Sequence, residues 1–222
     1  MRKTLIRLLT AGTAAALLLI GAASAATAGT HSGTANSGAV SSSANLRSGL
    51  RPATPPLARA AARSGVSPQD AIGCWNNDGF KSAASGYWVS AEVGYTGSEY
   101  GMLRARASSV GPWEQYDLCY DYTNDYWYIR SVQNGLYVSA EVGYSGNYYG
   151  MLRARASAVG PWEKYGLYCT AAGTLVIVSD QNHTYVSTEL GYTGGDYGML
   201  RARATANGPW EQYYTYTGRL GC

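Results

Sequence analysis

Two tyrosines and an arginine recur at fixed spacing in three stretches of this 222-residue chain. Each stretch contains the pattern GY(T/S)GxxYGMLRAR, in which the tyrosines flank a glycine-bearing segment and the arginine follows four residues after the second tyrosine. Phenol rings combine an apolar face with a hydroxyl, which suits stacking on sugar rings or contact with a protein partner. The candidate ligand-binding residues are therefore Tyr95, Tyr100, Arg104, Tyr144, Tyr149, Arg153, Tyr192, Tyr197 and Arg201.

The same side chains also have structural interpretations. The two rings of each pair would brace a hairpin by packing on each other, and Glu92 would pair with Arg104 or Arg106 across it. A tryptophan follows Gly-Pro once in each stretch, and we expect this ring to be buried at a strand junction, with a ligand-facing ring as the alternative. The tryptophans are Trp113, Trp162 and Trp210.

Catalytic and metal-binding patterns are weak. The two histidines, His31 and His183, have no repeated counterparts, so no nucleophile, base and acid arrangement is indicated. Carboxylates related by a repeat, such as Glu92 and Glu141, should lie too far apart for a glycosidase pair. The cysteines form no C-x-x-C pair. We therefore expect no enzyme activity, no metal and no cofactor.

Three repeats determine the predicted fold. Val89, Val138 and Val186 begin nearly identical segments at steps of 49 and 48 residues, and each repeat contains four short segments with strand-like alternation. We expect the second strand at 87–93, the third at MLRARA and the fourth at WEQYDL. On the third strand, Leu103 and Ala105 should face inward, and Met102, Arg104 and Arg106 outward. Three such units close into an all-β fold, a β-trefoil of three four-stranded repeats.

The chain divides into three predicted parts. Residues 1–28 have the basic start, apolar run and small-residue cleavage site of a secretory signal peptide, so we expect a secreted protein without a stable membrane span. Residues 29–69 are rich in Ser, Gly, Ala and Pro and are expected to form a flexible spacer. The β-trefoil domain should occupy 70–222, with repeats at about 75–122, 123–171 and 172–222.

The charge of the chain limits the classes of partner it could bind, and its cysteine content indicates disulfides. From Asp70 onward the chain has ten Lys and Arg against fourteen Asp and Glu, and this net charge of −4 argues against nucleic acid as a partner. Four cysteines in an exported chain suggest two disulfides, for which three pairings exist. Because the ends of a trefoil meet at the open end of the barrel, we expect the pairs Cys74–Cys222 and Cys119–Cys169.

The string YVSAE, a glycine-bearing hairpin, LRARA and GPWEQY together resemble the fascin-like, or actin-crosslinking, β-trefoil repeat over about 75–220. The resemblance implies a trefoil and a binding role, since the family includes actin-bundling proteins and secreted bacterial modules. The leading hypothesis is a secreted, non-catalytic module that binds a polysaccharide, a cell-surface glycan or another repetitive surface through three equivalent hairpin sites. A fascin-like crosslinker of protein filaments is the alternative, and a secreted hydrolase inhibitor is a third hypothesis.

Overall fold

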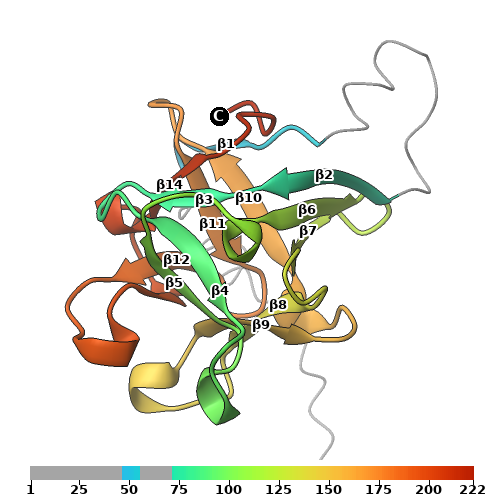
Figure 1. The fold of residues 1–222 in the computed structure, drawn as a ribbon. Coiled ribbons are helices and arrows are strands. Elements are labelled where there is room, and N and C mark those ends of the chain that lie inside the picture. The colour runs from blue at the N-terminus through green and yellow to red at the C-terminus, as the bar shows by residue number, and fades with distance from the viewer. Residues whose placement is uncertain (1–46, 56–71) are drawn as a thin grey trace, which may run out of the picture. The chain divides into compact units, whose positions relative to one another are not determined.

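The computed structural model describes residues 47–55 and 72–222, and in this part the chain forms strands and short 3₁₀ turns (Figure 1). The predicted signal peptide, residues 1–28, lies outside the described residues, as do residues 29–46 and 56–71. The 14 strands of the described residues belong to one continuous hydrogen-bonded sheet.

Each of the three units contributes four strands in the same order. The first unit contains β3 (Phe80–Ser82), β4 (Trp88–Glu92), β5 (Met102–Ala107) and β6 (Tyr116–Asp121). The second contains β7 (Tyr126–Ser131), β8 (Tyr137–Glu141), β9 (Met151–Ala156) and β10 (Tyr165–Cys169). The third contains β11 (Leu175–Ser179), β12 (Thr184–Glu189), β13 (Met199–Ala204) and β14 (Gln212–Thr215). The predicted all-β class and β-trefoil architecture are confirmed.

Antiparallel pairing closes the three units into a ring. The fourth strand of each unit pairs with the first strand of the next, as β6 with β7, β10 with β11 and β14 with β3. The second and third strands form a hairpin, and the third strands β5, β9 and β13 also pair with one another. Figure 1 shows these three hairpins projecting with their tips near one another.

The core follows the period-two alternation of the repeats. Val89, Ala91, Leu103 and Ala105 are at most 1% exposed and belong to one apolar cluster. The tyrosine two residues after the glutamate of each GPWE segment is fully buried, and its hydroxyl donates to a main-chain oxygen. In the first unit, Tyr116 donates to the oxygen of Val89 at 3.2 Å. Burying this polar atom is acceptable because the carbonyl satisfies it.

The sequence predicted a fourth strand that begins at the tryptophan, and this prediction is wrong. In each unit, Pro, Trp and Glu form a 3₁₀ turn, and the strand starts two residues after the Glu in the first two units and one residue after it in the third. Proline suits the start of such a turn, and the Glu114 carboxylate stabilises it by accepting from the Gly111 N–H at 2.8 Å. These turns are η2 (Pro112–Glu114), η4 (Pro161–Glu163) and η6 (Pro209–Glu211). The hairpin tips hold η1 (Gly97–Glu99), η3 (Gly146–Tyr148) and η5 (Gly194–Asp196).

Two disulfides are present, but the predicted pairing is wrong. The bonds join Cys74 to Cys119 and Cys169 to Cys222. The first pairing arises because β2 (Ile72–Asp78) lies antiparallel to β6 with Cys74 directly opposite Cys119. The second arises because the end of the chain also reaches β10, where the Leu220 oxygen lies 4.0 Å from the Cys169 Sγ.

Residues 47–55, which we call the arm, were expected to be part of the flexible spacer. In the structure β1 (Arg51–Pro52) pairs with β10, and the Ala53 N–H donates to the oxygen of Leu167 at 2.9 Å. The Ala53 side chain is 3% exposed and joins the main core cluster. The arm is therefore part of the folded unit.

Candidate binding site

The predicted arginines, which we call the tip arginines, are buried with 4–6% of their surface exposed. Arg153 shows the pattern: its Nε and Nη2 donate to the main-chain oxygens of Tyr100 and Gly97 in the preceding unit, each at 2.9 Å. Its Nη1 donates to the Tyr144 hydroxyl of its own unit, also at 2.9 Å. Arg104 and Arg201 make the corresponding bonds, and Arg104 closes the ring onto the third unit.

The prediction that Met102 and Arg104 on the third strand face outward is wrong. Met102, Met151 and Met199 are fully buried in a second cluster, against which Tyr95, Tyr144 and Tyr192 pack. The three hairpin tips meet over this face of the third strands and cover it. Because the tip arginines bind the hairpins and these tyrosines cover the methionines, the geometry supports a role for both sets in holding the tips together.

The second tyrosine of each tip is held less uniformly. The hydroxyls of Tyr100 and Tyr149 each accept from an asparagine side chain of the next unit at 3.3 Å, from Asn134 and Asn182 respectively. The first unit has Ser85 at this position, and the tyrosine that would face it, Tyr197, is 37% exposed. Of the six predicted tyrosines, Tyr197 is therefore the most available to a ligand.

The tryptophans are more exposed than the sequence predicted. Trp113 and Trp210 are 37% and 56% exposed, and Trp162 is half-buried. The reason lies in the following glutamate, which turns inward: Glu114 is 8% exposed and accepts hydrogen bonds from the Ser90 hydroxyl and the Gly111 N–H. The Pro-Trp-Glu turn thus places the indole at the surface. We call Trp113, Trp162 and Trp210 the groove tryptophans.

In the first two units, the indole lies near the glycine that follows the second strand. A Cβ atom on Gly143 would lie 3.0 Å from Cη2 of Trp162, and one on Gly94 would lie 3.6 Å from Cη2 of Trp113. In the third unit, a Cβ on Gly191 would meet no atom within 4 Å. There the space is open, and a groove of about 430 Å³ lies between Trp210, Arg203 and Gly191.

A buried glutamate fixes an arginine in each unit. Glu141 is fully buried and accepts two hydrogen bonds from Arg155, with Nη2 and Oε2 2.8 Å apart. The pairs Arg106–Glu92 and Arg203–Glu189 have the same geometry. This confirms the expected cross-hairpin pairing of Glu92, with Arg106 as its partner. Bonding to glutamate raises the pKa of each arginine, and the arginine side chain stays 38–47% exposed.

Each unit therefore presents an indole and a fixed guanidinium, and in the third unit both line one groove. The sequence contained the signal for this site, since Trp, Glu and the second arginine recur in register. Residues 47–55 and 72–222 contain no helix with the length and hydrophobicity that a membrane crossing needs. In this part of the chain, no three His, Cys, Asp or Glu side chains gather as metal ligands would.

Comparison with known proteins supports the fold. No protein-family model and no curated protein matches the chain. Among solved structures, the chain is similar to ThreeFoil, a designed threefold-symmetric protein, with a TM-score of 0.52 and 15% identity over 62% of this chain and 96% of that one. It is also similar to a mosquitocidal holotoxin, with a TM-score of 0.52 and 11% identity over 67% of this chain and 17% of the toxin. At such identities the likeness shows a β-trefoil fold, and the resemblance to the fascin-like family stays a prediction.

Proposed function

We propose that this chain is a secreted, non-catalytic module that binds a repetitive glycan through three repeated surface sites, each built on a groove tryptophan and most open in the third unit. The observation that carries the proposal is the threefold repetition of a solvent-accessible indole together with an arginine held by a buried glutamate. An indole face stacks on the apolar face of a sugar ring, and fixed polar groups beside it orient the hydroxyls.

Threefold repetition favours an extended target. A single shallow groove binds weakly, but a polysaccharide that reaches two or three grooves would gain about 10²–10⁴ in apparent affinity. A soluble oligosaccharide that fills one groove would not show this gain. Polysaccharides and cell-surface glycans are therefore the partners that the site supports.

Export supports this choice of partner. The N-terminal 28 residues have the features of a secretory signal. All four cysteines are paired in disulfides, which persist in oxidising compartments. The fascin-like resemblance of the repeats supports the alternative proposal, a protein filament as the repetitive target.

The test is a pull-down of the secreted protein on chitin, cellulose, xylan and peptidoglycan, with sedimentation on F-actin in parallel. The test variant replaces the three groove tryptophans with alanine. The matched control replaces Tyr87 and Tyr214 with alanine, since these rings are 42% and 53% exposed and do not line the groove at Trp210. We expect retention on one polysaccharide that the groove variant loses and the control keeps.

Two results would contradict the proposal. Retention of the groove variant, with its melting temperature near that of the wild type, would place binding elsewhere on the surface. Sedimentation with F-actin alone would support the filament alternative instead.

A further inference from the structure

The β6–β7 hairpin differs from its counterpart in the second unit. It has the sequence CYDYTNDYWY at 119–128, where the second unit has CTAAGTLV at 169–176. Tyr120, Tyr126 and Trp127 thus have no aromatic counterpart in that segment. The hairpin is a single-copy feature in an otherwise repetitive molecule, and the three tryptophan grooves do not account for it.

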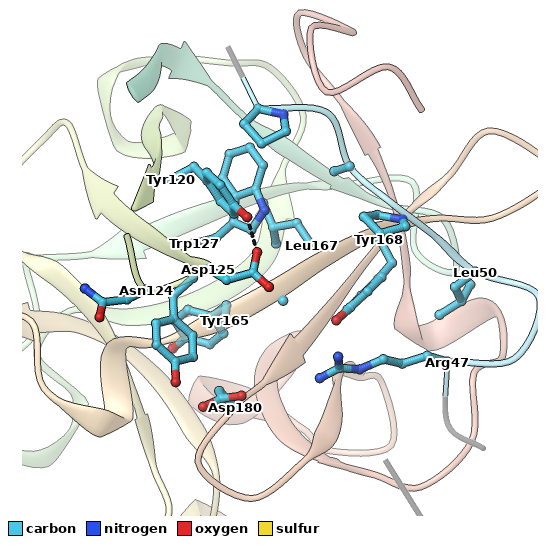
Figure 2. A pocket seen from close by; sticks show the side chains of 15 residues that line it. Arg47, Leu50, Tyr120, Asn124, Asp125, Trp127, Tyr165, Leu167, Tyr168 and Asp180 are labelled. Carbon is cyan, nitrogen blue, oxygen red and sulfur yellow. Dashed lines mark hydrogen bonds between the residues drawn. The ribbon is translucent and has the colours of Figure 1, made fainter. Parts of the chain in front are cut away.

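This hairpin forms one wall of a pocket of about 520 Å³, shown in Figure 2. The arm forms another wall through Arg47, Leu50 and Ala53, and β10 contributes Tyr168. Deeper lining residues include Tyr165, Trp127 and Leu167, which are at most 3% exposed. The pocket exists only because the arm pairs with β10, so it too has a single copy.

Two carboxylates face this space, and neither takes part in an ion pair with a residue that the structure describes. Asp125 has a positive φ of 61° at the end of the hairpin turn, and the Tyr120 hydroxyl donates to its Oδ1 (Figure 2). The Asp180 carboxylate has no hydrogen-bond partner within residues 47–55 and 72–222. Its acceptor capacity is therefore available to a ligand.

The aromatic walls already carry cations of the chain itself. The Arg47 guanidinium lies 5.0 Å from the ring centre of Tyr168, and the Lys164 ammonium lies 4.4 Å from that of Tyr126. Burial raises the pKa of the Tyr168 hydroxyl, the positive charge of Arg47 lowers it, and Asp125 and Asp180 raise it further. All three charged groups therefore act on the same phenol.

The lining residues contribute two carboxylates and one guanidinium, so one carboxylate has no cation among the lining residues; the Lys164 ammonium lies beside them, on the Tyr126 ring. Tyrosine faces attract cations and also stack on apolar sugar faces. The volume falls in the range of about 300–1,000 Å³ that is usual for small-molecule sites. A ligand with a protonated amine, an apolar ring face and hydroxyl groups meets each of these conditions.

We propose that this pocket is a second binding site, separate from the tryptophan grooves, and that it takes an amine-bearing saccharide of one or two rings. The ammonium group binds between Asp180 and Asp125, and the sugar ring lies against Tyr168. The site does not depend on the proposed polysaccharide binding.

The test is isothermal titration calorimetry on the secreted protein at low salt and mildly acidic pH, with two probes that differ by charge. One is the glucosamine disaccharide with free amines and the other is its N-acetylated form. We expect the amine form to bind at least about tenfold more tightly, as a charge-assisted hydrogen bond predicts. Asp180→Asn should weaken it about tenfold, with little change in melting temperature because the carboxylate has no partner to lose.

Asp125→Asn is the second variant, since the amide keeps an oxygen for Tyr120, and it should weaken binding in the same direction. Asp196→Asn, on a hairpin tip, is the matched control and should bind like the wild type, as should the groove variant. Equal binding of both disaccharides, binding of neither, or unchanged binding by Asp180→Asn would each overturn the inference. A failure of the polysaccharide pull-down would leave these expected results unchanged.

Discussion

The substitution Arg153→Met tests whether the tip arginines hold the three hairpins together. Arg153 is 5% exposed and donates three hydrogen bonds, two of them to the preceding unit. Methionine fills a similar length without donors, so the change removes the bonds and leaves most of the packing. If the arginine served a ligand instead, its loss would weaken binding and leave stability unchanged.

The magnitude follows from the bonds that are lost. Three hydrogen bonds from a charged donor contribute about 1.5 kcal/mol each, and removing a buried charge offsets part of the loss. We therefore expect the free energy of unfolding to fall by about 2–4 kcal/mol. For a domain of this size, that corresponds to a decrease in melting temperature of roughly 10 °C.

Urea denaturation of the wild type, Arg153→Met and the control Arg219→Met measures this change. Arg219 is exposed, and its guanidinium donates one long hydrogen bond of 3.4 Å to the oxygen of Asn76 and lies 5.9 Å from the ring centre of Trp75. A double-mutant cycle with Tyr144→Phe isolates the Nη1 bond, and the two effects should be less than additive. A loss of stability no greater than that of Arg219→Met would refute the claim that the tip arginines hold the hairpins together.

Three further predictions concern the frame around the sites. Gly150 has a φ of +73°, and a Cβ there would lie 2.4 Å from the Ala202 oxygen, so Gly150→Ala should destabilise the fold by more than about 3 kcal/mol, measured by urea denaturation. Gly146→Ala, where a Cβ meets open space at a φ of +61°, is the control and should cost only about 1–2 kcal/mol. Ala53→Arg should lower the melting temperature far more than Ala171→Arg, because Ala53 is buried and Ala171 is exposed. Equal decreases would contradict the packing of the arm against the core. Peptide mapping of a non-reduced digest should recover Cys74 with Cys119 and Cys169 with Cys222, and a Cys74–Cys222 peptide would contradict the structure.

The repeats were sufficient to predict the architecture because each unit contains its own alternation. Val89, Leu103 and Ala105 face the barrel core, as period-two spacing requires. The opposite face of the third strand could not be predicted in this way, because what covers Met102 and Arg104 comes from other units. The residue pattern of one strand does not identify the residues of other units that pack against it once the ring is closed.

The candidate site was predictable in part. The register of Trp, Glu and the second arginine was visible in the sequence, but the inward turn of Glu114 decides that the indole faces solvent. The arm shows a similar limit, since the Ser-, Gly-, Ala- and Pro-rich composition of residues 29–69 indicated a spacer. One buried residue, Ala53, and a few main-chain hydrogen bonds fix it to β10, and composition does not report such contacts.

The central claim, that three tryptophan sites act together, is tested by removing the groove tryptophans one, two and three at a time. Binding of each variant to the retained polysaccharide would be measured beside binding of a short oligosaccharide of the same sugar. We predict that apparent affinity for the polysaccharide falls stepwise, by roughly tenfold or more for each groove lost, while the oligosaccharide affinity of each remaining groove stays constant. A single substitution that abolishes all binding, or a triple substitution that changes none, would contradict the account.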